Sequence, residues 1–195
     1  MKRYGLEICL RQICFDHRFT QIDTQISTDL FYMSEIIIRT IEPGDNAVLA
    51  KIIRDTLAEF KANKPNTVYY DDRTDHLFEE FHAPGSVYFV AEENGIIIGG
   101  GGIYPTENLP EGTCELVKLY LAPAARGKGI GKLLLEKSLA AARSIGYKKV
   151  YLESMPELTI AIPLYEKYGF THLSCAQGNS GHTGCDVWMI KDLEE

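Results

Sequence analysis

The stretch LAPAARGKGIGKLLLEKSLAAA, which runs from Leu121 to Ala142, joins an apolar segment to a leucine-rich one through three glycines and three basic residues. Apolar residues recur at helical spacing from Ile130 onward, which predicts a helix over residues 130–145 that Gly146 ends as a C-terminal cap. The preceding run TCELVKLYLAP, at residues 113–123, predicts a strand. The chain is therefore expected to pass from a strand through a glycine-rich turn into a helix N-terminus.

This strand, turn and helix start together predict a binding site for an anion. Unpaired backbone amides converge at a helix N-terminus, and the helix dipole adds partial positive charge. Glycine permits close approach and positive φ, while basic side chains supply formal charge. The glycines are Gly127, Gly129 and Gly131, and the basic residues are Arg126, Lys128 and Lys132. We expect a phosphate or diphosphate here; the alternative is a glycine-rich helix start on the surface.

Two other kinds of phosphate loop fail on spacing. A Walker loop needs a glycine where Arg126 stands and a serine or threonine where Leu133 stands. A dinucleotide fingerprint that begins at Gly127 needs a glycine where Lys132 stands, and the sequence around it lacks an alternating βαβ pattern. Neither class of nucleotide site is predicted.

Length and composition predict one ordinary globular domain. A chain of 195 residues with 45% hydrophobic content can build a single sizeable core. The net charge of -7 and the pI near 5.3 argue against a nucleic-acid binder and favour cationic small molecules. No run approaches the roughly 18 apolar residues of a membrane span. The five cysteines are irregularly spaced, which indicates reduced thiols. We expect a soluble, cytoplasmic protein.

The first 32 residues differ from the rest of the chain. They show no sustained period of 2 or 3.6, and a second methionine follows them at Met33. We expect residues 1–32 to be an N-terminal extension: a flexible tail, an artefact of an upstream start or a small added element. Residues 33–195 are expected to form the domain.

Hydrophobic periodicity after Met33 predicts an α+β order of strands and helices. A strand at residues 34–41 precedes a helix with apolar positions from Val48 to Phe60, for which Asp45 is a candidate N-terminal cap. Asn94-Gly95 joins two strands as a hairpin. The other expected elements are short helices at residues 75–81 and 159–168 and strands at 148–154, 170–175 and 185–193.

Two signatures resemble those of the GNAT superfamily of N-acetyltransferases. The pattern Arg-x-x-Gly-x-Gly that ends at Gly131 resembles the family's coenzyme A pyrophosphate loop. The run LYEKYGF, in which Tyr165 precedes Gly169 by four residues, resembles the signature on the family's short C-terminal helix. The resemblance implies an α+β fold with a mixed, mostly antiparallel seven-stranded sheet flanked by helices. It also implies acetyl-CoA as cosubstrate and no metal.

The resemblance carries specific residues with it. It implies that backbone amides hold the diphosphate and that Leu119 and Leu121 present backbone groups to the pantetheine arm. The family often has Asn three residues before the alanine matched by Ala161, whereas Leu158 stands here, so main-chain binding is expected in its place. The implied diphosphate residues are Arg126, Gly127, Lys128, Gly129, Ile130, Gly131 and Lys132.

Acetyl transfer to an amine needs a proton acceptor. An amine of pKa about 10.4 is neutral in only about one molecule in 2500 at pH 7, so a base or a water chain must take the proton. Glu115 resembles the glutamate that some family members use as base; the alternative is a solvated glutamate on a strand face. Glu153 is the reserve candidate.

The leaving thiolate needs a hydrogen-bond donor or an acid. Tyr165 resembles the family's proton donor, although a tyrosine on an amphipathic helix is otherwise a packing residue. Proton donation from unperturbed tyrosine to a thiolate is uphill by about 2 kcal/mol, so Tyr165 is expected to hydrogen-bond the developing thiolate. Tyr168 keeps the packing interpretation.

The remaining polar residues are open to two interpretations. The histidines at 76, 82, 172 and 182 are too scattered for a metal site and are expected at the surface or in hydrogen bonds. An acidic cluster between Asp71 and Glu80 is either a solvated face or a receptor for a cationic substrate. The loop at residues 176–184 is a second candidate wall of the acceptor site.

We therefore expect an acetyl-CoA-dependent N-acetyltransferase that acts on the primary amine of a small-molecule or amino-acid-like acceptor. Peptide or protein amino termini are an alternative acceptor class, and a non-catalytic acyl-CoA sensor is an alternative function. No nucleic-acid or membrane partner is expected, and a homodimer is left open.

Overall fold

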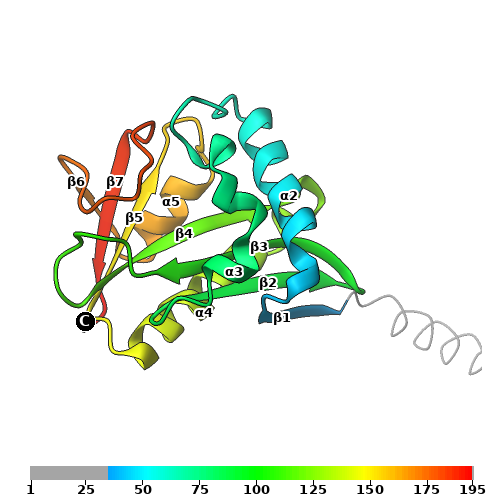
Figure 1. Cartoon of the computed structure of the whole chain (residues 1–195), viewed down its shortest axis with the longest axis horizontal. Coiled ribbons are helices and arrows are strands. Elements are labelled where there is room, and N and C mark those ends of the chain that lie inside the picture. The colour runs from blue at the N-terminus through cyan, green and yellow to red at the C-terminus, as the bar shows by residue number, and fades with distance from the viewer. Residues whose placement is uncertain (1–34, 195) are drawn as a thin grey trace, which may run out of the picture. The chain divides into compact units, whose positions relative to one another are not determined.

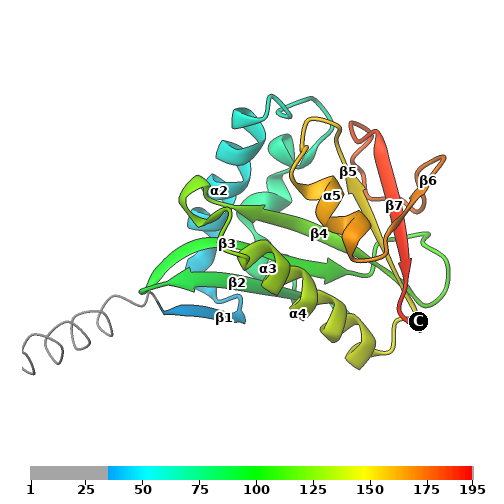
Figure 2. The same cartoon turned by 180° about the vertical axis from the view of Figure 1, so that it is seen from behind.

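The computed structural model describes residues 35–194, and the expectations for residues 1–32 lie outside the described residues. The described chain forms one seven-stranded sheet with helices on both faces, as Figures 1 and 2 show from opposite sides. The strands are β1 Ile36–Thr40, β2 Val87–Glu93, β3 Ile96–Tyr104, β4 Thr113–Leu121, β5 Lys149–Ser154, β6 Thr171–Leu173 and β7 Val187–Asp192. The α-helices are α2 Asn46–Glu59, α3 Leu77–Glu80, α4 Ile130–Ile145 and α5 Ala161–Lys167.

The strand order is β1-β2-β3-β4-β5-β7-β6, and only the β4–β5 pair is parallel. This confirms the mixed, mostly antiparallel sheet. The hairpin between β2 and β3 turns at Asn94 and Gly95, whose φ values are 53° and 80°. Positive φ at both positions is what a two-residue primed turn requires, so the Asn-Gly prediction is confirmed.

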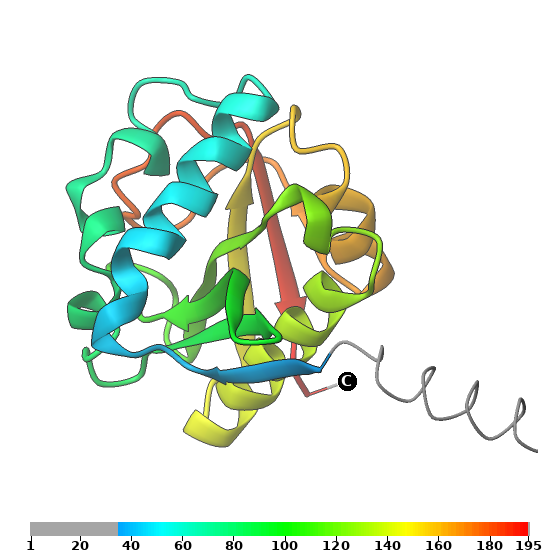
Figure 3. The same ribbon diagram turned by 90° about the vertical axis from the view of Figure 1, so that its right-hand side faces the viewer.

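Helices α2 and α3 cover one face of the sheet, and α4 and α5 cover the other, which the turned view makes clear (Figure 3). Each helix buries the apolar stripe that its sequence predicts. Helix α2 packs Leu49, Ile53 and Leu57 into a core with Tyr88. The core on the opposite face receives Leu135 and Leu139 of α4 together with Tyr165 and Phe170. The sheet is therefore enclosed on both sides, which leaves its interior strands, β4 among them, largely buried.

Helix α4 begins and ends as predicted, whereas the start of α2 differs. Gly129 and Gly146 flank α4 in left-handed conformations, with φ values of 80° and 105°. Asp45 precedes α2 but makes no side-chain cap, so that prediction is wrong. Its carboxylate accepts hydrogen bonds from Arg39 at 2.7 and 2.9 Å and from the Glu42 amide at 2.7 Å. Arg39 draws the carboxylate toward β1, away from the helix amides.

Strands β4 and β5 separate halfway along their length. They pair from Thr113 opposite Lys149 to Leu116 opposite Leu152, and β4 then continues on β3 alone. The separation coincides with a bulge in β4. Between Val117 and Tyr120, two residues of β4 lie opposite a single residue of β3. Bulges bend a strand and locally end its regular pairing. The gap between β4 and β5 therefore opens at the bulge.

Lys118 lies at the centre of this bulge, with a φ of 52°. Its carbonyl accepts a hydrogen bond from the Tyr88 hydroxyl at 2.9 Å. The Tyr88 ring passes so close over β3 that a Cβ on Gly100 would meet it at 2.5 Å. Glycine in β3 thus lets an aromatic ring of β2 reach across the strand and hold the bulge in β4.

Candidate active site

Two cavities adjoin the gap between β4 and β5. The helix-side cavity lies toward α4 and α5 and is lined by Leu119, Leu121, Arg126, Gly131 and Tyr165, among others. The loop-side cavity lies toward residues 67–81 and 180–185 and includes Glu115. They share a wall of six residues: Leu116, Lys118, Tyr120, Glu153, Ser154 and Leu158. Two molecules that entered from opposite sides would therefore meet at the gap.

The glycine hinge lies at the end of the helix-side cavity. Gly127 and Gly129 have φ values of 77° and 80°, in the left-handed region. The first hydrogen bond into α4 runs from the Leu133 amide to the Gly129 carbonyl at 3.1 Å. The amides of Ile130, Gly131 and Lys132 precede that bond and so have no partner within the helix. These free donors are what the anion-site prediction requires.

Gly131 differs from the other two glycines of the hinge. Its φ lies outside the left-handed region, so of the two properties that glycine permits, positive φ is used at Gly127 and Gly129 and not at Gly131. A Cβ there would meet the Leu121 side chain at 3.5 Å, an ordinary contact. Gly131 also lines the cavity, so its missing side chain leaves room for a ligand rather than relieving backbone strain.

The three basic side chains of the hinge are already paired with carboxylates. Arg126 bonds both Glu59 oxygens at 2.8 Å, Lys128 bonds Glu93 at 2.8 Å, and Lys132 lies 3.8 Å from Glu136. The expected formal charge is present at the hinge, but each of the three side chains has an acidic partner within reach. The amides of the hinge remain as its principal anion-binding groups.

Arg126 also ties the hinge to its neighbours. Its guanidinium lies 5.1 Å from the centre of the Phe60 ring, and its Nε donates to the Leu121 carbonyl at 3.2 Å. Thr56 donates to that carbonyl too, at 3.3 Å. The Arg126 amide donates to Pro123. Neither this amide nor the Leu121 carbonyl is free. The expected backbone contacts at Leu119, Leu121 and the hinge stay predictions.

Glu115 projects from β4 into the loop-side cavity and is 5% exposed. Burial raises the pKa of its carboxyl to about 7; the Thr106 hydroxyl, which donates to it, opposes the rise, and the charge of Glu153 adds to it. A group with this pKa exchanges a proton near neutral pH, which suits a general base. The alternative of a solvated strand-face glutamate is wrong for this side chain.

Glu153 lines both cavities but is held differently. Tyr151 donates to one of its carboxylate oxygens at 2.9 Å, and Ser180 donates to the other at 2.8 Å. Both oxygens are therefore engaged, which leaves this carboxylate less open to an incoming proton than that of Glu115. Ser180 belongs to the 176–184 loop, so Glu153 also anchors that loop.

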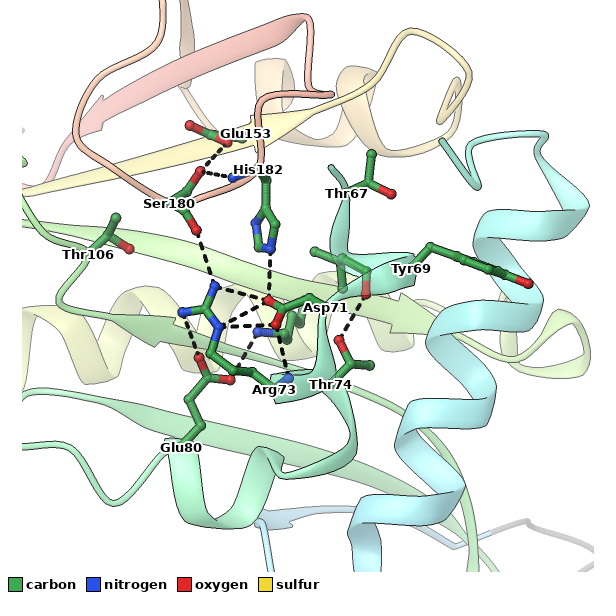
Figure 4. Close-up of polar contacts among 12 residues, drawn as sticks. Thr67, Tyr69, Asp71, Arg73, Thr74, Glu80, Thr106, Glu153, Ser180 and His182 are labelled. Atoms are coloured by element: carbon green, nitrogen blue, oxygen red, sulfur yellow. Dashed lines mark hydrogen bonds and ion pairs between the residues drawn. The ribbon is translucent and has the colours of Figure 1, made fainter. Parts of the chain in front are cut away.

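A network of ion pairs forms the wall of the loop-side cavity (Figure 4). Lys118 and Glu80 make a buried pair at 3.0 Å, with side chains only 4% and 8% exposed. Arg73 lies 3.5 Å from Glu80 and 3.0 Å from Asp71. His182 contacts the same Asp71 carboxylate at 2.9 Å. The network links β4, α3, the segment before α3 and the 176–184 loop.

These contacts decide the two interpretations of the acidic cluster. Asp71 and Glu80 both face Arg73, and Glu80 lines the cavity, whereas Asp75 pairs with Arg54 at 2.6 Å and Glu79 accepts from Asn46 at 2.8 Å. The cluster as a whole is therefore neither one solvated face nor one receptor. The 176–184 loop contributes Ser180 and His182 to the lining of this cavity, and its place in an acceptor site stays a prediction.

Tyr165 lies on α5, where it lines the helix-side cavity and packs beside Phe170 with ring centres 5.8 Å apart. Within the part of the chain that the structure describes, its hydroxyl makes no hydrogen bond. Burial raises the pKa of this hydroxyl above its ordinary value. Tyr165 is therefore a weaker acid than a free tyrosine but still a hydrogen-bond donor without a partner. Tyr168 packs against the same core and donates to Glu136 at 2.6 Å.

Sequence reasoning missed Arg73, Lys118 and Thr106 as residues of the site. Lys118 carried a signal, because a lysine inside the otherwise apolar run ELVKLYL must either leave the strand face or find a buried partner. Arg73 and Thr106 carried none, since each stands in a polar connection. Among residues 35–194, no three side chains could together hold a metal ion, and no helix is long and apolar enough to cross a membrane.

Comparisons with known proteins agree with the geometry. Residues 50–170 match the sequence profile described as "Acetyltransferase (GNAT) family". The chain is 40% identical to the uncharacterized N-acetyltransferase YjgM of Escherichia coli over 159 residues, 80% of this chain and 95% of that protein. It is 30% identical to the probable N-acetyltransferase family 8 member 5 of Mus musculus, over 78% of this chain and 70% of that protein.

Solved structures show the same fold. A GNAT acetyltransferase from Staphylococcus aureus Mu50 superposes with a TM-score of 0.72 at 19% identity, over 82% of this chain and 99% of that one. The PaiA N-acetyltransferase of Thermoplasma acidophilum in complex with coenzyme A gives 0.65 at 20% identity, over 81% and 99%. YncA of Salmonella typhimurium with acetyl-CoA gives 0.66 at 24% identity, over 83% and 96%.

Proposed function

Because this chain belongs to the GNAT family and is an N-acetyltransferase, we propose that it transfers an acetyl group from acetyl-CoA to the primary amine of a small molecule. One observation carries the proposal. Two cavities share a wall at the β4–β5 gap; one leads to a helix start with free amides, and the other contains a buried carboxyl whose pKa is about 7. The first suits the donor, and the second suits the acceptor.

The helix-side cavity has the features that acetyl-CoA needs. Amides from Gly127 to Lys132 would bind the diphosphate, helped by the dipole of α4, and Gly131 leaves space beside them. The apolar wall between Leu119 and Leu164 would cover the pantetheine arm. The thioester would then lie near the gap, beside Tyr165, which lines the same cavity. Two neighbours of the same fold that carry coenzyme A or acetyl-CoA support the assignment.

The loop-side cavity would bring the amine to the opposite side of the gap. Glu115 would accept a proton from the amine, because its buried carboxylate is readily protonated near pH 7. The neutral nitrogen would attack the thioester carbonyl directly, so that the carbon–nitrogen bond forms as the carbon–sulfur bond breaks. Glu153 would anchor the 176–184 loop through Ser180. Its negative charge would lie beside the incoming ammonium ion.

Tyr165 would stabilise the thiolate that leaves. Burial that raises its pKa makes proton transfer to sulfur more uphill, so its role is to donate a hydrogen bond to the developing charge. A donor that is unpaired before the reaction meets no competing partner when that charge appears. The nitrogen gives up a second proton as the amide forms. That proton would reach the thiolate through water, so that coenzyme A leaves as the free thiol, and the first proton would leave Glu115 through water.

The test is release of free thiol when the full chain is mixed with acetyl-CoA and a panel of primary amines, with products identified by mass. The proposal predicts thiol release and one acetyl group on the amine in equal amounts. Acetyl-CoA binding without thiol release would instead indicate a non-catalytic sensor. Acetylation of added proteins, followed by intact mass, would favour the peptide or protein acceptor class.

A further inference from the structure

Around the loop-side cavity the cationic side chains have carboxylate partners, whereas two of the carboxylates have only neutral hydrogen-bond donors. Its cationic side chains are Arg73 and Lys118, and His182 stands beside them. Lys118 Nζ is committed to Glu80 at 3.0 Å and is buried. His182 Nε2 is committed to Asp71 at 2.9 Å. Each of these groups therefore already has a carboxylate within ion-pair distance.

Arg73 is occupied on all three of its nitrogens. Nε donates to both Asp71 oxygens at 3.2 and 3.1 Å, and Nη2 donates to the Ser180 carbonyl at 3.3 Å and lies 3.0 Å from Asp71. Nη1 lies 3.5 Å from Glu80. A guanidinium that receives a substrate carboxylate usually offers two parallel N–H donors. Here that fork is turned toward the protein's own carboxylates (Figure 4).

The anionic side chains, by contrast, are not all matched by cations. Glu115 is bonded by the Thr106 hydroxyl, and Glu153 by the Tyr151 and Ser180 hydroxyls. Within residues 35–194, neither carboxylate makes an ion pair. The lining of the cavity therefore holds three carboxylates, Glu80, Glu115 and Glu153, against the two cations Arg73 and Lys118.

Resting on the proposed function, we propose that the acceptor is a primary amine that carries no carboxylate beside the amino group, an organic cation rather than an amino acid. An ammonium ion entering the cavity would offset the charges of Glu115 and Glu153. A substrate carboxylate would add negative charge beside these two groups, where each cation already has a carboxylate partner, and burying a charge without a matching opposite charge is costly. The charge inventory of the cavity thus selects against amino acids.

The experiment compares acceptors that differ in charge but little in size. The full chain is assayed by thiol release with 2-phenylethylamine, phenylalaninamide and phenylalanine, and with ethanolamine, serinamide and serine. Values of kcat/KM are expressed per neutral amine. We expect each amino acid to fall at least about tenfold below its own amide, because only the carboxylate distinguishes them. An amino acid used as well as its amide, or better, would overturn the inference.

A variant pair tests the assigned charges. Glu153→Gln removes one negative charge and can still accept the hydrogen bond from Tyr151. It should raise several-fold the ratio of kcat/KM for each amino acid to kcat/KM for its amide. Glu111→Gln, on the exposed turn before β4, is the matched control and should leave the ratio unchanged. An unchanged ratio in Glu153→Gln would count against the inference.

The outcome also separates this inference from the proposed function. Preferential use of amino acids would leave the proposed acetyl transfer standing and overturn only the acceptor class. No thiol release with any of the six compounds, in a protein shown by calorimetry to bind acetyl-CoA, would overturn both.

Discussion

Replacing Glu115 by Gln should make the protein more stable and less active. The carboxyl has an ordinary pKa of 4.5 and a pKa of about 7 in the folded protein, where it is buried. The folded state therefore binds this proton more tightly than the unfolded chain does. The stability that the protonated carboxyl confers is fully present below pH 4.5 and is lost as the pH rises through 7.

The size of this effect follows from the two pKa values. They differ by about 2.5 pH units, and each unit corresponds to about 1.4 kcal/mol, so ionised Glu115 destabilises the fold by about 3 kcal/mol at pH 8. Glutamine has no charge to bury and can accept the Thr106 hydrogen bond. The melting temperature of Glu115→Gln should thus exceed that of the unaltered protein by roughly 6–12 °C at pH 8 and by almost nothing at pH 4.5.

Activity should change in the opposite direction. If Glu115 takes the proton from the amine, kcat/KM of the unaltered protein rises with pH through about 7. In Glu115→Gln this acidic limb of the pH profile should disappear, and the rate should fall about 10²- to 10⁴-fold. Glu153→Gln is the control: it keeps the base but removes a charge that raises the pKa of Glu115, so its acidic limb should persist at a lower pH.

Melting curves from pH 4.5 to 8 and initial rates from loss of the thioester absorbance measure both effects. The reasoning fails if Glu115→Gln gains no stability at pH 8, because the carboxyl would then not be buried in its charged form. It also fails if the variant keeps the acidic limb and the full rate. A limb that disappears only in Glu153→Gln would assign the base to Glu153.

Three further predictions address the donor side and the domain boundary. Tyr165→Phe should lower kcat about 10- to 1000-fold while the Kd for acetyl-CoA stays within a few-fold, since the hydroxyl acts on charge that appears only in the transition state; unchanged turnover with a saturating amine would return Tyr165 to packing. Gly129→Val should weaken acetyl-CoA binding in a folded protein, because the added Cβ meets no neighbouring atom but valine is strained at a φ of 80°; calorimetry that finds full affinity would argue against a coenzyme site at the hinge. We propose that a chain that begins at Met33 retains its melting temperature and coenzyme affinity, because β1 begins only at Ile36; insolubility or a drop of many degrees would contradict this boundary.

Local sequence predicted the elements well because they depend on short stretches of chain. The helix over residues 130–145 is α4, and the hairpin turns where Asn94-Gly95 predicts. Both follow from the φ preferences of glycine and asparagine and from hydrophobic periodicity. Asp45 shows the limit of such reasoning. Its sequence position suits a helix cap, but its carboxylate pairs with Arg39 of β1 instead of with the helix amides.

The partners of charged side chains could not be predicted in the same way. Arg126 meets Glu59 across 67 positions of sequence, and His182 meets Asp71 across 111. The sequence contains every one of these charges, but nothing near any of them indicates which pairs meet. Only the tertiary fold makes those distances short, because it brings the hinge beside the end of α2 and the loop before β7 beside the segment before α3. Whether the hinge's basic residues are free for a phosphate is likewise decided by such contacts.

The sequence by itself determined the order of strands and helices, the glycine hinge and the residue types available for chemistry, because these depend on preferences expressed within a few residues. The tertiary structure alone decided where β4 and β5 part, that Lys118 lies buried in a bulge, and that Glu115 is shielded from water and Glu153 held by two hydroxyls. Proton affinity and ion pairing depend on burial and on distance in three dimensions, so the same glutamate would be an ordinary surface acid or a base near pH 7 according to what packs around it.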